Sequence, residues 1–399
     1  MIEELGLHHP LLSRYEAAAQ KTFSQNAYRF SEEYIGKKLD EANLYPEQRD
    51  GILAFMTFAR TDRRILEAMW LFYYLQFCTD ECFLFDLWDG GLDSVPSPAV
   101  CEEKFPGYFR ETVYLLASDH LANFLTKNGF SSEYLTGYYE KMRVFADDNL
   151  QSHGTYGFCR LAPFMYVYAY PAIVRIGRLI YQVHKPEEGI ALYRDEEGRH
   201  RLFATDAFSY NAAGLRDETA DFRPVYRKEG EFLTAHPFLP NGRLSPRPER
   251  VELRTLTPLL GEGDYLVYLH IPPLGRLTPE AVDASIEEAK RILPSFFRGF
   301  PLRGIACATW LLDPALREVL PEGSNILEFQ DRFNLACCQD NHNRSLRDHI
   351  FRVPIETPLS ELRPKNSFQE KMLARAIRGE KMYWTFGLLK GDHDFGKSE

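Results

Sequence analysis

The stretch "LHIPPLGRLTPEAVDASIEEA", residues 269–289, joins a strand-like segment to one with helical spacing. Thr278 can cap this helix and Pro279 suits its first position, which leaves backbone N–H groups at a helix end that carries partial positive charge. Such an end can bind a phosphate group. The alternative is that Glu280 and Glu287 already complement the helix dipole and the loop holds no ligand. The sequence therefore predicts either an anion site or a plain strand-to-helix turn.

His270, at the end of the strand-like segment, is the first candidate for proton transfer. An imidazole with a pKa near neutrality suits a general base, although a single His at a strand end can also be a structural hydrogen-bond donor. Glu328 and Asp313 are alternative acid–base groups. Ser324 and Asn325 precede an apolar stretch, where they either face a pocket or cap a helix.

The elements that must position these residues change character along the chain. From 13 to 150, apolar residues recur at i, i+3 and i+4, which predicts an all-helical first part. Beyond about residue 160, β-branched runs predict strands over 172–184 and a pair of strands around a Glu-Glu-Gly turn within 190–205. The proline-rich stretch 236–258 is expected to be an irregular, ordered connection.

A strand–helix–strand unit follows this connection. Residues 264–272 and 303–312 read as strands, and residues of about 279–297 read as a helix between them. The segment after Asp313 should open another helix, because an Asp cap is followed by Pro. The sequence thus predicts a βαβ unit.

Composition excludes several classes of function. The formal charge of -10 opposes general binding to nucleic acid, and no uncharged apolar run is long enough to cross a bilayer. The start of the chain lacks the pattern of a signal peptide, so we expect a cytoplasmic protein with seven reduced cysteines. Cys78 and Cys82 lack a second pair of matching ligands, and no metal is expected. Cys337 and Cys338 are expected in a polar surface loop rather than at a nucleophilic or metal site.

Three segments resemble a known family. "RIGRLIYQV", "LHIPPLGRLTPEAVDASIEEAKRILPSFF" and "CATWLLDPALREVLPEGSNILEFQDRF" are similar to motifs of a bacterial acyltransferase-domain family, whose members combine a helical N-acyltransferase N-terminal domain with a GNAT-like C-terminal domain. The motifs lie between residues 174 and 333. The resemblance implies an α+β fold, with an all-helical N-terminal domain over 1–165 and a GNAT-like mixed sheet with flanking helices over 166–399.

The resemblance also implies a cofactor site. In such enzymes a strand separates from its neighbour, the pyrophosphate of acyl-CoA binds the following loop and helix end, and the pantetheine runs between the strands. These would be strand 264–272, loop 273–278 and partner strand 303–312. The chain departs from the pattern because it lacks R/Q-x-x-G-x-G/A between strand and helix. The expected cofactor-binding residues are Ile271, Leu274, Gly275, Arg276, Leu277, Thr278 and Trp310.

The resemblance favours direct transfer of an acyl group from acyl-CoA, as co-substrate, to a small nucleophile, in particular an amine. His270 and Glu328 would be catalytic, while Ser324 and Asn325 would contact the small-molecule acceptor. Neither nucleic acid nor a membrane is an expected partner. The aromatic segment 69–77 offers more apolar surface than one small helical bundle is expected to bury, so a homo-oligomer is a further possible partner arrangement. The alternative function is a non-catalytic metabolite- or CoA-binding protein that retains the GNAT-like fold.

Overall fold

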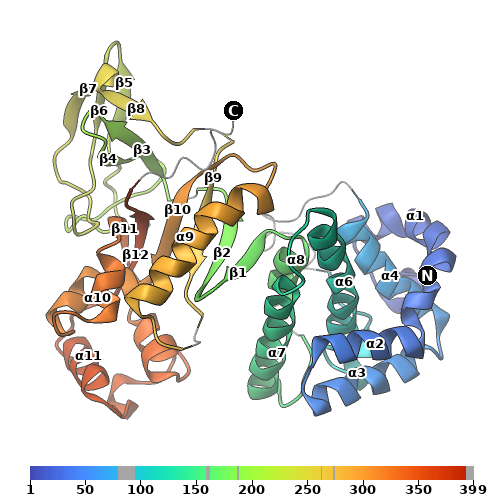
Figure 1. Cartoon of the computed structure of the whole chain (residues 1–399). Coiled ribbons are helices and arrows are strands. Elements are labelled where there is room, and N and C mark those ends of the chain that lie inside the picture. The colour runs from blue at the N-terminus through green and yellow to red at the C-terminus, as the bar shows by residue number, and fades with distance from the viewer. Residues whose placement is uncertain (80–94, 159–161, 187, 262, 273–274, 392–399) are drawn as a thin grey trace. The chain divides into compact units, whose positions relative to one another are not determined.

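The computed structural model describes residues 1–79, 95–158, 162–186, 188–261, 263–272 and 275–391 (Figure 1). Its residues form two compact units, Met1–Arg175 and Ile176–Glu399. Helix α8 (Ala162–Ala169) crosses the domain boundary predicted at residue 165 and belongs to the first unit. No helix within the described ranges is long and apolar enough to cross a membrane.

The first unit is helical, as the apolar spacing predicts. Its N-terminal caps include His9, Ser31 and Asp62, each of which accepts a hydrogen bond from a backbone N–H of the helix it precedes. The helices before α8 are α1 (Pro10–Asn26), α2 (Glu32–Ala42), α3 (Pro46–Ala59), α4 (Arg63–Phe77), α5 (Ala99–Lys104), α6 (Tyr108–Lys127) and α7 (Tyr134–His153).

Helix α4 supplies much of the core of this unit. Most of the aromatic segment 69–77 is buried, and Trp70 stacks on Tyr73 with ring centroids 5.2 Å apart. The Trp70 indole N–H donates to the backbone oxygen of Ala19. The segment is therefore part of the core, and it does not provide an exposed apolar surface for a homo-oligomer.

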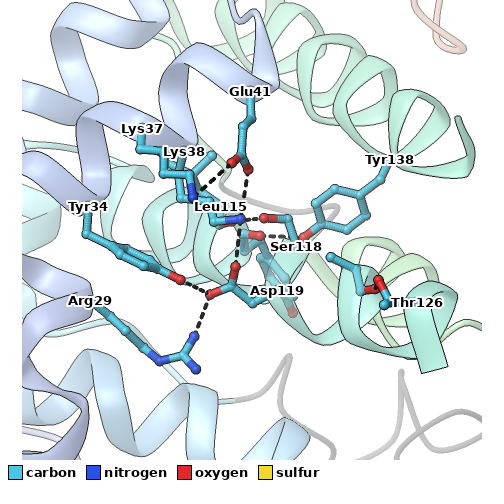
Figure 2. Close-up of polar contacts among 12 residues, drawn as sticks. Arg29, Tyr34, Lys37, Lys38, Glu41, Leu115, Ser118, Asp119, Thr126 and Tyr138 are labelled. Carbon is cyan, nitrogen blue, oxygen red and sulfur yellow. Dashed lines mark hydrogen bonds and ion pairs between the residues drawn. The ribbon is translucent and has the colours of Figure 1, made fainter. Parts of the chain in front are cut away.

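A partly buried ion cluster links α2 to α6 (Figure 2). The Asp119 carboxylate accepts from Arg29 and Tyr34, both at 2.5 Å, and pairs with the Lys38 amine at 2.6 Å. Lys38 also pairs with Glu41 at 2.9 Å. Burial lowers the pKa of Lys38, but the hydrogen bonds to Asp119 and Glu41 outweigh it and the pKa lies above its ordinary value. Sequence reasoning did not find this cluster.

The second unit is built on a six-stranded sheet whose first strand begins at Ile173, just before this unit starts, so the predicted α+β fold is confirmed. The strand order is β1-β2-β9-β10-β12-β11. Strands β9 and β10 run parallel, while β2–β9, β10–β12 and β11–β12 are antiparallel. The strands are β1 (Ile173–Ile176), β2 (Leu179–His184), β9 (Tyr265–His270), β10 (Leu302–Thr309), β11 (Phe333–Asp340) and β12 (Tyr383–Leu389).

The last part of the chain completes this sheet. β12 lies between β10 and β11 in the sheet, although in the sequence it comes after β11 and is separated from it by helical elements. The segment between them contains a π-helical turn over Leu346–Phe351 and helix α11 (Ser367–Ile377). These elements bury Leu346 and Met372 in a separate apolar cluster.

Two smaller sheets replace part of the predicted irregular connection. Residues 249–258 include two short strands, so the prediction of an entirely irregular 236–258 is wrong in its last part. Proline did not prevent pairing there because Pro258 ends an edge strand. The first sheet orders β4 (His200–Ala204), β3 (Ile190–Asp195) and β8 (Leu256–Pro258), and the second orders β5 (Tyr226–Glu229), β6 (Phe232–Ala235) and β7 (Glu249–Glu252).

Helix α9 (Pro279–Phe296) crosses one face of the large sheet (Figure 1). It buries Val282, Ile286, Ala289 and Leu293, the stripe that its sequence predicts. After β10 the chain forms a 3₁₀ turn over Pro314–Glu318 rather than the expected longer helix. The short helix α10 (Asn325–Gln330) follows.

Candidate functional site

The two central strands of the sheet part before they end. The parallel β9–β10 register includes Ile305–Val267 and ends at Ala306–Tyr268. Beyond this point β9 stays paired with β2 as far as His270, and β10 stays paired with β12 as far as Thr309. Each strand therefore continues on its outer side while the inner ladder stops. The resemblance to GNAT enzymes implies such a separation near Ile271. The last β9–β10 pair involves Tyr268, three residues before Ile271.

The two faces of the sheet differ at this point. Alternation places Tyr268 and His270 on one face of β9. Tyr268 packs there against the apolar cluster that contains Leu266 and Phe386. On the opposite face, the Tyr181 hydroxyl of β2 lies 3.0 Å from Ser285 Oγ of α9. At the end of the β9–β10 ladder, α9 thus covers one face of the sheet and His270 lies on the other face.

The N-terminus of α9 is capped as its sequence predicts. Thr278 Oγ1 accepts from the backbone N–H of Ala281 at 3.4 Å, and Pro279 occupies the first turn. Gly275 has a φ of 66° with open space around it, a conformation that favours glycine. Ile271 and Leu277 are half-buried, Arg276 is exposed, and Leu274 lies outside the described residues.

An arginine from a distant turn holds the loop before α9. Arg178 donates to the backbone oxygens of Pro272 at 2.9 Å, Gly275 at 3.3 Å and Arg276 at 3.2 Å. Residues 172–184 are a hairpin that turns at Gly177, which has a φ of 55°. Arg178 therefore lies in the turn between β1 and β2, whereas Arg175 lies in β1. Arg175 pairs with Glu140.

Two imidazoles lie on the face that carries Tyr268. His270 is exposed, and its Nε2 lies 3.0 Å from Gln182 Oε1. His184 is half-buried, and its ring packs edge-on against Tyr268 at 5.5 Å. The Tyr268 hydroxyl donates to Glu188. Sequence reasoning missed His184 and Glu188, because only the β2–β9 register and the loop after β2 bring them to Tyr268.

The hydrogen bond of His184 defines its neutral tautomer. His184 Nδ1 lies 2.7 Å from the backbone oxygen of Lys185. A carbonyl oxygen only accepts, so Nδ1 carries the proton and the lone pair of the neutral ring is on Nε2. This is the protonation pattern of a general base.

The other predicted site residues lie on α10 and at the end of β10. Ser324 caps α10, because its Oγ accepts from the backbone N–H of Ile326 at 3.4 Å, and Asn325 is the first helical residue. Glu328 follows in the first turn and is half-buried. Helix α10 packs against α9. The contacts described for Glu328 and His270 do not join the two residues.

Trp310 directly follows β10 and stacks on His349, with ring centroids 6.2 Å apart and planes at 12°. His349 also packs against Trp384, and both line a polar cavity of about 500 Å³. Asp340 lines the same cavity. Trp310 is therefore part of an aromatic cluster on the side of β10 away from β9.

Buried groups near the sheet end have structural contacts. Asp313 accepts from the backbone N–H groups of Ala315 and Tyr383, and burial raises its pKa to about 6. Cys337 and Cys338 are buried in β11, so the prediction of a polar surface loop is wrong for them. Leu335 and Ala336, which precede them, pair with β12 and bring this stretch into the sheet. Burial raises the pKa of Cys338 to about 12, which opposes a role as a thiolate nucleophile.

Together, a parallel strand pair that parts, a helix that follows the first strand and a capped helix end define a GNAT-type sheet. The family model of the GNAT-like C-terminal domain matches residues 173–389. The chain belongs to this family, as its sequence motifs predict.

Solved acyltransferase structures share the fold of nearly the whole chain. One is an acyltransferase in complex with decanoyl-CoA, with 16% identity, a TM-score of 0.58, and coverage of 90% of this chain and 88% of that chain. An acyltransferase in complex with decanoyl-CoA and teicoplanin has 16% identity, the same coverages and a TM-score of 0.57. A complex with CoA and 10C-teicoplanin has the same values as the latter. No curated protein sequence matched the chain.

Proposed function

We propose that the chain is an acyl-CoA-dependent acyltransferase that moves the acyl group directly to a small nucleophile, in particular an amine. The observation that carries this proposal is the end of the β9–β10 ladder at Tyr268–Ala306. The thioester arm of acyl-CoA would pass there, from the α9 side to the face with His270. Family membership and the acyl-CoA complexes of similarly folded proteins support the assignment.

The described residues suit such a ligand. The first turn of α9 offers the backbone N–H of Glu280 to a pyrophosphate, because Pro279 has no N–H and that of Ala281 donates to Thr278. Arg276 adds an exposed positive charge. Backbone N–H groups of the separated strands would polarise the thioester carbonyl.

We assign the transfer of the acceptor proton to His270, which follows the last inner strand pair. His184 is the second candidate, because its tautomer already places the lone pair on Nε2. Glu328, Ser324 and Asn325 would contact the acceptor from α10. The amine nitrogen attacks the thioester carbon and the base takes the amine proton. The carbon–sulfur bond then breaks, and the base passes that proton to the departing sulfur, so that CoA leaves as the thiol.

The test measures release of the CoA thiol from a panel of acyl-CoAs, with and without amine acceptors. Ala308→Trp fills the position just beyond the last inner pair, and we expect it to abolish both acyl-CoA binding and thiol release. Ala374→Trp, on the exposed side of α11, is the matched control. Among base variants, the true base is the one whose replacement by Gln removes the acidic limb of the pH–rate profile.

A second function, favoured by the missing R/Q-x-x-G-x-G/A pattern, is a metabolite- or CoA-binding protein that retains the GNAT-like fold without turnover. Thermal stabilisation by CoA with no thiol release in any acceptor mixture would support it. If CoA does not stabilise the wild-type chain and no thiol is released, both functions are contradicted.

A further inference from the structure

An apolar cavity of about 110 Å³ lies between the large sheet and the β4-β3-β8 sheet. Leu266, Phe386 and Leu388 form its floor on the large sheet, while Leu192 and Leu202 come from β3 and β4. Glu188 and Thr205 are among the few polar residues of its lining.

The cavity and the end of the β9–β10 ladder share one apolar cluster. Leu192, Leu202, Leu266 and Phe386 belong to one buried cluster. Tyr268 and Ala308, which flank the last inner pair on this face, pack against the same cluster. The Tyr268 hydroxyl donates to Glu188, a lining residue. An acyl chain that emerges between the strands would therefore meet apolar side chains of this cluster, beside the Tyr268–Glu188 hydrogen bond, before it reaches the cavity.

The dimensions set the length of a matching chain. A cavity of ~150 Å³ lined by Leu, Ile and Phe holds benzene, so 110 Å³ has room for about four carbons. Two residues of strand separate Tyr268 from Leu266, or about 6.8 Å. Carbon–carbon bonds in a zigzag advance roughly 1.3 Å each, so this path takes about five more carbons. The sum is a chain of about nine carbons.

We propose that this cavity binds the end of the acyl chain of the donor, and that it selects medium-chain acyl groups. The inference rests on the proposed function, because the donor must first bind between β9 and β10. The wall of Leu202 and Leu192 sets the limit of chain length, and the cavity excludes water from the apolar tail.

The experiment measures Kd for acyl-CoAs of two to sixteen carbons by calorimetry, and thiol release for the same panel. We expect the wild-type chain to prefer acyl groups of about eight to ten carbons. Leu202→Phe reduces the cavity and should shorten the preferred chain by about two to four carbons, with at least fivefold weaker decanoyl-CoA binding and unchanged CoA binding. Ile190→Ala enlarges the cavity and should lengthen the preferred chain.

Leu373→Phe is the matched control, since Leu373 packs in a different apolar cluster of the same unit. It should leave the chain-length profile unchanged. If acyl-CoA binds but Leu202→Phe and Ile190→Ala both keep the wild-type profile, the inference is overturned and the proposed function stands. If the wild-type chain binds neither CoA nor any acyl-CoA, both are overturned.

Discussion

Glu111 and Gln48 form a fully buried polar pair in the helical unit. The Gln48 amide Nε2 donates to Glu111 Oε1. Gln48 Oε1 and Glu111 Oε2 are also buried and have no partner. Burial raises the pKa of Glu111 from 4.5 to about 8, although the hydrogen bond from Gln48 lowers it. Because the carboxyl is fully buried and its Oε2 has no donor beside it, we expect it to be neutral at pH 7.

This proton sets the sign of a pH dependence. The unfolded chain releases it near pH 4.5, while the folded chain keeps it up to about pH 8. The stabilising contribution is therefore complete below 4.5 and falls as pH rises through about 8, by ~1.4 kcal/mol per pH unit. Over the 2.5 units between 4.5 and 7 the loss is about 3 kcal/mol. Tyr108 is the neighbouring titratable group, and burial followed by the charge of Glu111 raises its pKa to about 12.

Glu111→Gln should remove this cost. The amide keeps the shape of the protonated carboxyl and can still accept from Gln48 Nε2. We expect a gain of about 2–3 kcal/mol in the free energy of unfolding of the helical unit at pH 7, and almost none at pH 4.5. Urea denaturation of the full chain from pH 4.5 to 8.5, followed by helical circular dichroism, measures it.

Glu103→Gln is the control, because Glu103 is exposed and the same chemical change should alter stability by less than about 0.5 kcal/mol. The reasoning is refuted if Glu111→Gln destabilises the helical unit at pH 7 and the wild-type unit becomes more stable between pH 5 and 7.5. That pattern would mean that the buried carboxylate is ionised and held by a cation.

Three further predictions follow from the described contacts. Asp119→Asn leaves two cations beside a neutral amide and should cost the helical unit about 3 kcal/mol in urea denaturation, whereas Asp40→Asn, at an exposed ion pair, should change stability by less than about 0.5 kcal/mol. Arg178→Lys cannot reproduce three hydrogen bonds to the loop before α9 and should weaken CoA binding by about tenfold, with little change in the melting temperature. Among the described cysteines, the exposed Cys78 should be alkylated in the native protein long before the buried Cys338, as peptide mass spectrometry can show.

The strand–helix–strand unit could be predicted from sequence because its determinants are local. A strand-like run, the Thr-Pro start of α9 and the apolar stripe of that helix lie within one continuous stretch. The position of β12 could not be predicted in this way. It pairs with β10 and β11 through contacts that are distant in sequence, such as Ala306–Leu388, and no local pattern specifies them.

The candidate site shows the same limit. The sequence indicates an imidazole at a strand end, His270. It does not indicate His184 as a site residue, because only the β2–β9 register places His184 beside Tyr268. The chain separates Tyr268 from Glu188 by 80 residues, yet a hydrogen bond joins them. A sequence pattern finds groups that act through their neighbours in the chain, and it misses those assembled by strand pairing.

Arg178 bears directly on the missing glycine-rich pattern. In a glycine-rich loop, the residues of the loop themselves provide the conformation that turns N–H groups toward a phosphate. Here three carbonyl oxygens of the loop before α9 are held by an arginine more than 90 residues earlier in the chain. Fixing the carbonyls of Gly275 and Arg276 restricts the directions of the N–H groups of the residues that follow them, because each peptide unit is planar; the unit that follows Pro272 ends in a proline and has no N–H. Loop shape can thus be imposed from outside, and the absence of R/Q-x-x-G-x-G/A is weak evidence against an anion site at this helix end.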